Sequence, residues 1–136
     1  MIQQKFIRLP EMARGIHLIT SYIESQLGAM PKEGILNIFL QHTSAAITIN
    51  ENADPLVRKD FNMVLDRLVP EGRTSYLHDM EGLDDMPAHV KSSIIGQSVS
   101  IPIANGRLAL GMWQGIYFCE FRNYGGPRSV VLTIYS

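Results

Sequence analysis

Short apolar segments, separated by glycines and prolines, run along most of this chain of 136 residues. Runs of four to eight residues that are apolar, or that alternate between apolar and polar, are typical of β-strands. The segment 34–41 is apolar at nearly every position, so we expect a strand buried on both faces. In the first strand we expect Phe6 and Leu9 to be available to a core. The predicted strands are Gln3–Leu9, Ile16–Ile19, Gly34–Gln41, Ala45–Asn50, Val99–Ile103, Leu108–Met112, Ile116–Phe121 and Val130–Ile134.

Three other segments carry helical signals. Asp54 followed by Pro55 is a typical helix start, because the aspartate caps free backbone N–H groups and the proline fits the first turn. Gly28 and Gly96 each stand just past a segment with helical spacing and are typical helix stops. The predicted helices are 20–27, 55–68 and 87–95, the second with an apolar face of Val57, Phe61, Val64, Leu65 and Leu68.

The order of these elements indicates the fold class. Strands joined by short turns pair antiparallel, and the helices do not alternate regularly with the strands. We therefore expect an α+β fold with a mainly antiparallel, two-layered, sandwich-like sheet core flanked by short helices. The length fits one domain over residues 1–136, with no internal repeat and no linker composition.

Composition narrows the range of partners. A formal net charge of -1 gives no general attraction to nucleic acid or to an anionic membrane. Apolar residues make up 46% and charged residues 18%, an ordinary globular balance. Cys119 is the single cysteine, which favours a reducing compartment. With no signal-peptide pattern and no long apolar run, we expect a cytoplasmic protein without a nucleic-acid or membrane partner.

The segment from Tyr76 to Ser93 is the strongest candidate for a functional site. Two imidazoles and several carboxylates are a ligand set for a divalent cation, although the spacing matches no standard zinc motif. The alternative is a solvated acidic loop, but such loops seldom combine two histidines with no balancing lysine between residues 76 and 90. The residues concerned are His78, Glu81, Asp84, Asp85 and His89.

Four further residues are candidates on weaker signals. His42 ends an apolar strand and opens into Thr-Ser, where a scaffold often presents a polar group; the alternative is a core histidine bonded to backbone. Lys91 and Ser92 follow His89 and could meet a phosphate, although an exposed lysine explains Lys91 as well. Trp113 could wall a pocket for a flat ring, or simply pack in the core.

The last candidates surround a Gly-Gly-Pro turn. Arg122 and Arg128 bracket it and could form an anion-binding nest with its backbone; an ordinary hairpin turn is the equal alternative. Glu120 lies on an otherwise apolar strand. Burying an unpaired carboxylate is costly, so Glu120 needs a partner, such as Arg122, a histidine or a metal.

Taken together, these motifs resemble one family. They are His42-Thr43-Ser44-Ala45-Ala46, Asn50-Glu51-Asn52, Asp54-Pro55, His78 with Glu81-Gly82, Asp85 to Ser93, and Trp113-Gln114-Gly115-Ile116. In this combination the chain resembles the YjbQ-like family of small proteins, whose members are commonly labelled secondary thiamine-phosphate synthase. The resemblance covers nearly the whole chain. It has one departure: Met112 stands where the family usually has threonine, which removes a hydroxyl near the expected pocket.

The resemblance implies a β-sandwich core, a homotrimer, and a site where His42, His78 and His89 converge. It also implies weak formation of thiamine phosphate, in which a pyrimidine diphosphate loses pyrophosphate and a thiazole phosphate nitrogen attacks the resulting carbon. A divalent metal (zinc, manganese or magnesium) held by the three histidines would stabilise the leaving group. Glu81 or Asp85 would orient the histidines or handle protons.

The remaining candidates would then bind the substrate. Lys91, Arg122 and Arg128 would help to stabilise the leaving pyrophosphate, Ser92 would donate to a phosphate, and Trp113 would stack on the pyrimidine. Three other readings use the same residues: hydrolysis of a phosphate ester at the same metal, a non-catalytic trimeric module that binds a metal or metabolite, and a purely structural polar stretch.

Overall fold

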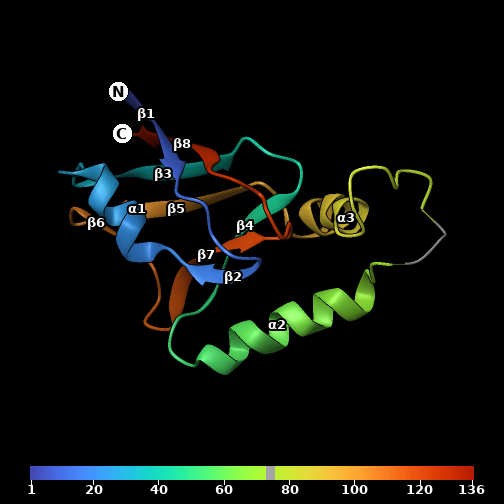
Figure 1. The fold of residues 1–136 in the computed structure, drawn as a ribbon. Coiled ribbons are helices and arrows are strands. Elements are labelled where there is room, and N and C mark those ends of the chain that lie inside the picture. Colours follow the sequence, from blue (N-terminus) through green and yellow to red (C-terminus); the bar gives the residue numbers. More distant parts are fainter. Residues whose placement is uncertain (73–75) are drawn as a thin grey trace.

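Two antiparallel sheets make up most of the structure, a computed structural model that describes residues 1–72 and 76–136 (Figure 1). One sheet has the strand order β1-β8-β3-β5-β6 and the other β2-β7-β4. The elements in chain order are β1 (Ile2–Leu9), β2 (Gly15–Leu18), α1 (Thr20–Leu27), β3 (Glu33–Leu40), β4 (Ala45–Glu51), α2 (Pro55–Leu68), α3 (Asp85–Ile95), β5 (Ser98–Ala104), β6 (Arg107–Leu108), β7 (Gln114–Glu120) and β8 (Arg128–Tyr135). The predicted α+β class, with a mainly antiparallel two-sheet core, is confirmed.

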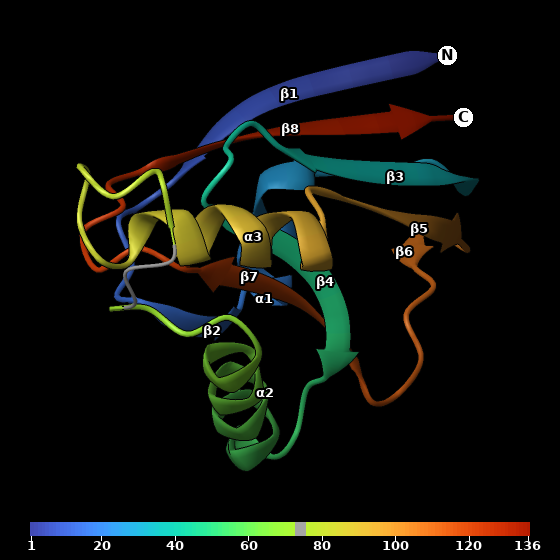
Figure 2. The same ribbon diagram turned by 90° about the vertical axis from the view of Figure 1, so that its right-hand side faces the viewer.

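The main core lies between the two sheets. Alternate residues of β3, β8 and β5 meet residues of β4 and β7 there, and Ile23 of α1 is fully buried in the same cluster. The other face of β7 packs against residues of α2 and α3, and α3 lies across this strand in Figure 2. Strand β7 is therefore the strand that is buried on both faces, and it ends beside α3. Within the described ranges, no helix has both the length and the apolar character needed to cross a bilayer.

The second cluster, between β7 and the helices, contains the single cysteine. Tyr117 and Cys119 point from β7 toward Leu65 of α2 and Ala88 of α3. Burial there raises the pKa of the Cys119 thiol to about 12. The thiol is thus a small core group.

No described element of this chain covers the outer face of the five-stranded sheet, which carries two apolar rows on either side of a polar row, Gln4–Thr133–Asn37. Two rows of side chains, which we call the outer apolar rows, cross β1, β8 and β3 there: Phe6–Val131–Phe39 and Ile2–Tyr135–Ile35. Phe6 is 70% exposed, so the expectation that it enters the core is wrong. The prediction that β3 is buried on both faces is wrong for the same reason, because Ile35 and Phe39 point outward.

Two further predictions need correction. Of the strand predicted at 108–112, only Leu108 lies in a strand, as the second residue of β6, and the chain then runs into a turn. In that turn the side chain of Gln114 accepts a hydrogen bond from the Gly111 N–H (2.8 Å). In α2, of the predicted apolar face only Leu65 is buried, and Val64 and Leu68 are exposed. The Asp54 cap is confirmed, since its side chain accepts from the Leu56 N–H at 2.9 Å.

A buried ion pair joins the two sheets at the end of β7. Glu120 is fully buried, and its carboxylate accepts from Arg128 at the start of β8 through Nε (2.8 Å) and Nη2 (2.5 Å). A side chain on Gly125 would meet both partners, because its Cβ would lie 2.7 Å from Arg128 Nη2. Arg128 is thus the partner that Glu120 needs. Because Gly125 has no side chain, the turn can pass close to this ion pair.

We expect Glu120→Ala to lower the free energy of unfolding by about 3–5 kcal/mol, because it leaves a buried guanidinium without its counterion. Urea unfolding measures this. The matched control is Glu71→Ala, which removes an exposed partner of Arg14 and should cost less than about 1 kcal/mol. Equal effects of the two substitutions would contradict the structural weight assigned to the buried pair.

Candidate functional site

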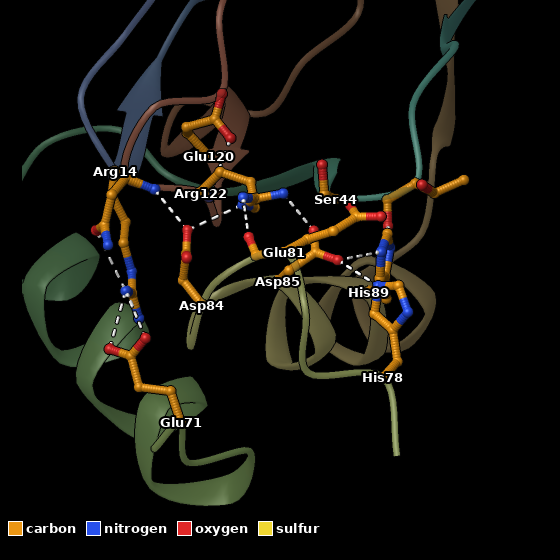
Figure 3. A network of polar contacts seen from close by, with 12 residues as sticks. Arg14, Ser44, Glu71, His78, Glu81, Asp84, Asp85, His89, Glu120 and Arg122 are labelled. Atoms are coloured by element: carbon orange, nitrogen blue, oxygen red, sulfur yellow. Dashed lines mark hydrogen bonds and ion pairs between the residues drawn. The ribbon is translucent and has the colours of Figure 1, made fainter. Parts of the chain in front are cut away.

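Two histidines and one aspartate converge at the start of α3. His78 Nε2 lies 2.6 Å and His89 Nε2 lies 3.1 Å from the same oxygen, Asp85 Oδ2. One ligand atom from each residue lies within 4.8 Å of the other two. Figure 3 shows Asp85 between Arg122 on one side and the two imidazoles on the other. We call His78, Asp85 and His89 the His–Asp–His cluster.

The geometry of α3 explains part of this arrangement. Asp85 and His89 are four residues apart on the helix, so they share one face. His78 comes from the loop before the helix, which turns back at Gly82 (φ 108°). Asp85 is 2% exposed. Burial opposes its ionisation, but the His78 hydrogen bond and the fields of His89 and Arg122 outweigh burial and hold the pKa of Asp85 below its ordinary value.

A second hydrogen bond orients the His89 ring. His89 Nδ1 lies 2.8 Å from the carbonyl oxygen of Thr43, which can only accept, so Nδ1 is the donor. The other ring nitrogen, Nε2, faces Asp85 and His78 and is the atom that a metal ion at the cluster would bind. Metal-binding histidines are commonly held in this way, with the second ring nitrogen bonded to a carbonyl or carboxylate.

A cavity of about 520 Å³ adjoins the cluster. His89 belongs to both, and the other lining residues are Phe39, Leu40, Gln41, His42, Thr43, Ser92, Ser93 and Gln97. The lining therefore combines an apolar patch from the end of β3 with neutral polar groups, and contains no lysine, arginine or carboxylate among the described residues.

His42 lies in this cavity but outside the cluster. Its Nε2 accepts a hydrogen bond from the Ser129 N–H at 2.7 Å, so the ring is neutral and carries its hydrogen on Nδ1. Burial and the positive charge of Arg128 lower the pKa of His42. The expected convergence of three histidines is not met in this geometry: His78 and His89 come together, and Asp85 is the third donor.

The other predicted residues of α3 have structural partners. Lys91 is 1% exposed; its Nζ donates to Asp66 Oδ1 of α2 (2.5 Å) and lies 5.7 Å from the Phe121 ring centroid. It is therefore not the exposed lysine that its position suggested, and its ammonium group is not among the cavity-lining groups. The Ser92 hydroxyl donates to the Ala45 carbonyl (2.7 Å), although Ser92 does line the cavity.

The side chains predicted to bind an anion are engaged in ion pairs, and the side chain predicted to stack on a ring is exposed. Arg122 bonds Asp84 and Asp85, and Arg128 bonds Glu120, so the predicted anion nest is replaced by two ion-pair sites. Trp113 is 62% exposed on the turn before β7, so it neither packs in the core nor lines the cavity. The Glu81 side chain is exposed, and its backbone carbonyl accepts from Arg122 Nη2 at 3.0 Å.

Two contributors were missed by the sequence analysis. The carbonyl oxygen of Thr43 orients His89, and the amide of Gln97 lines the cavity while bonding Ser92. A backbone carbonyl has no sequence signal. Gln97 stands just past a helix-stopping glycine, a position that indicates a turn and not a site.

We expect NMR of the imidazole nitrogens to show His42 as the Nδ1–H tautomer, with a titration midpoint below 6.5. Because the unfolded chain takes up this proton near pH 6.5 and the folded chain only at lower pH, the His42 contribution to stability is present above pH 6.5. It is lost as the pH falls from 6.5 through the lower pKa of His42 in the folded state. An Nε2–H tautomer, or a midpoint above 6.5, would contradict the assigned Ser129 hydrogen bond.

Comparisons with known proteins agree on one family. The family model described as "UPF0047 protein YjbQ-like" matches residues 5–136. UPF0047 protein YjbQ of Salmonella typhimurium is 47% identical over 133 residues, 96% of each chain. UPF0047 protein YugU of Bacillus subtilis is 50% identical over 96 residues, 71% of this chain and 68% of its own.

Solved structures show the same fold. A hypothetical protein from Aeropyrum pernix K1 matches with a TM-score of 0.84 at 29% identity, over 98% of both chains. An uncharacterized conserved protein of the YjbQ/UPF0047 family from Clostridium acetobutylicum matches with a TM-score of 0.81 at 38% identity, over 96% of this chain and 99% of its own. With matches this extensive in both sequence and structure, the chain belongs to the UPF0047 family of YjbQ-like proteins.

Proposed function

We propose that this protein is an enzyme that binds a divalent cation at the His–Asp–His cluster and acts on a small phosphorylated substrate in the adjoining cavity. The single observation that carries the proposal is that His89 belongs to both the cluster and the cavity. A cation at the cluster would therefore face the space where a substrate can bind.

The donor set fits a borderline divalent cation. Two imidazole nitrogens and one carboxylate oxygen are the protein ligands of many catalytic zinc sites, which leave a further position open to water or substrate. The same nitrogen and oxygen donors suit manganese, whereas magnesium prefers oxygen ligands. Zinc and manganese are therefore the first ions to test. His42 is not part of the proposed ligand set, because the Ser129 N–H occupies its Nε2.

The first reaction to test is the joining of a pyrimidine diphosphate to a thiazole phosphate. A bound divalent cation would supply Lewis-acid stabilisation of the leaving pyrophosphate. The thiazole nitrogen forms a bond to the pyrimidine methylene carbon, and the carbon–oxygen bond breaks with its electron pair leaving on pyrophosphate. No proton has to be removed from that nitrogen, so the reaction needs charge stabilisation more than a strong base.

The residues of the cavity have distinct roles in this proposal. Phe39 and Leu40 form an apolar wall for a heterocyclic ring. His42 donates through Nδ1 to an acceptor on the substrate, since its other nitrogen accepts from Ser129. The hydroxyls of Thr43 and Ser93 add further donors at the cavity surface.

A non-catalytic module that binds a metal or metabolite is the second candidate, and one observation favours it. Lys91, Arg122 and Arg128 are each paired with a carboxylate, so none of these three is free to stabilise pyrophosphate. Hydrolysis of a phosphate ester would use the same cluster with water as the nucleophile. Turnover measurements separate the three functions.

We expect isothermal titration with zinc or manganese to detect one site in the wild type. The variants His78→Ala, Asp85→Asn and His89→Ala should each weaken it at least about tenfold by removing a ligand atom. The matched control is His17→Gln, because His17 bonds the Ala13 carbonyl outside the cluster (2.6 Å) and should bind metal normally. His42→Ala should also keep its metal while losing turnover.

Formation of thiamine phosphate from the pyrimidine diphosphate and the thiazole phosphate, measured with metal present, tests whether the protein is an enzyme. Turnover that depends on metal and falls to background in His89→Ala supports the enzyme. Metal binding without any turnover above background supports the non-catalytic binding module instead. A wild type that binds neither cation contradicts the metal proposal itself.

We also propose that the protein assembles as a homotrimer through the outer apolar rows. Large exposed apolar side chains gathered on one face are typical of an interaction site, and Phe39 of these rows also borders the cavity. We expect sedimentation equilibrium to give three times the chain mass, and Phe6→Ser to give the monomer. Tyr124→Ser removes a ring that is just as exposed but lies on the β7–β8 connection, and should leave the trimer intact.

A further inference from the structure

The three side-chain nitrogens of Arg122 all contact residues at or just before the start of α3. Nε donates to Asp84 Oδ2 (2.9 Å), Nη1 pairs with Asp85 Oδ1, and Nη2 donates to the Glu81 carbonyl (3.0 Å). The backbone N–H of Arg122 in turn donates to Glu120 at 3.2 Å. One planar group, anchored beside the buried ion pair of β7, thus binds three points of the turn 81–85 (Figure 3).

This contact divides the two oxygens of Asp85 between different partners. Oδ1 pairs with Arg122, whereas Oδ2 receives His78 and His89. The terminal torsion angle of an aspartate side chain has a broad distribution. When only one oxygen of the carboxylate is bonded, the direction of the other oxygen is therefore not fixed. Arg122 therefore fixes the direction in which Oδ2 points toward the imidazoles.

The same guanidinium also supports the turn that brings His78 to the cluster. Asp84 is held by Arg122 and by the Asn123 N–H (2.9 Å), and these two bonds lower the pKa of Asp84 despite its burial. Gly82 lies against this contact, because a Cβ there would be 3.0 Å from Asp84 Oδ1 and 3.9 Å from Arg122 Nη2. The turn between His78 and α3 is thus packed onto the arginine.

An anion-binding role for Arg122 is not supported by these contacts. Its side chain is 24% exposed, but its three nitrogens already meet a carboxylate or a carbonyl, and it is not among the residues that line the cavity.

We propose that Arg122 is a positioning residue that holds Asp85 Oδ2 toward His78 and His89, and thereby sets the affinity of the cluster for a divalent cation. The inference rests on the proposed metal site. Lysine keeps the charge but presents one flexible ammonium group in place of the planar fork, so it cannot hold three acceptors in the same geometry.

The test uses the full chain with Arg122→Lys and Arg122→Gln. Zinc titration should show affinity about ten- to a hundredfold weaker than wild type, with lysine nearer to wild type than glutamine. In the metal-free protein, NMR of the ring nitrogens should show altered His78 and His89 signals and an unchanged His42. A purely structural role would leave these ring signals at their wild-type positions in any variant that folds.

Arg14→Lys is the matched control. Arg14 also bridges two carboxylates, Asp66 and Glu71, and its side chain is 17% exposed, but it does not contact Asp85. It should keep zinc affinity within about twofold of wild type, since it lies outside the ligand support that tunes metal sites. An equal loss in Arg14→Lys, or wild-type affinity in Arg122→Lys, overturns the inference.

Two further outcomes are decisive. If neither Arg122 variant folds, Asp84→Asn replaces them: it weakens one anchor of the guanidinium, and wild-type zinc affinity in that variant also overturns the inference. If the wild type binds no metal, the proposed function fails. The ring-nitrogen signals of the metal-free variants still decide whether Arg122 positions the cluster.

Discussion

A carboxylate that is buried must be paired, because an ion removed from water without a counterion costs several kcal/mol. Asp85 meets this requirement with partners from three separate parts of the chain: the loop that carries His78, the helix that carries His89, and the β7–β8 connection that carries Arg122. The path of the loop before α3 and the direction of the His78 and His89 Nε2 atoms are tied to this one group, while the Thr43 carbonyl holds the other nitrogen of His89.

The end of β7 supports this arrangement from below. Glu120 and Arg122 stand two residues apart, and each takes part in a separate ion pair, the first facing β8 and the second facing α3. The strand is packed on both faces, so it is a rigid support for Glu120 at its end and for Arg122 two residues beyond. A site built on such an element keeps its geometry better than one built on loops alone.

The sequence predicted the elements well because their signals are local. Strand patterns, the Asp54 cap and the stopping glycines depend on residues a few positions apart. The helix predicted from residue 87 begins two residues earlier, at Asp85, so its spacing to His89 on one helix face was not predicted. What the pattern could not supply was the partner of each charged group. Glu120 visibly needed a counterion, but only the pairing of the strands shows that Arg128 provides it. Lys91 looked exposed because its partner, Asp66, lies on another helix.

His42 shows the same limit at a single residue. It lines the cavity, but its Nε2 accepts a hydrogen bond from the backbone N–H of Ser129, which lies on a strand nearly ninety residues later in the chain. The outward face of β3 was misjudged for a related reason. An apolar sequence looks the same whether its strand is covered by a second layer of the chain or exposed on one face. Only the order of the strands in the sheet distinguishes these two cases.

The burial of Cys119 has a practical consequence for studying this protein. Burial between β7 and the helices raises the pKa of this thiol to about 12, so it carries almost no thiolate at neutral pH and we expect it to resist maleimides in the folded state. A single cysteine introduced at an exposed position, such as Met112→Cys on the turn before β7, would therefore accept a spectroscopic label selectively. The native thiol would not have to be removed first.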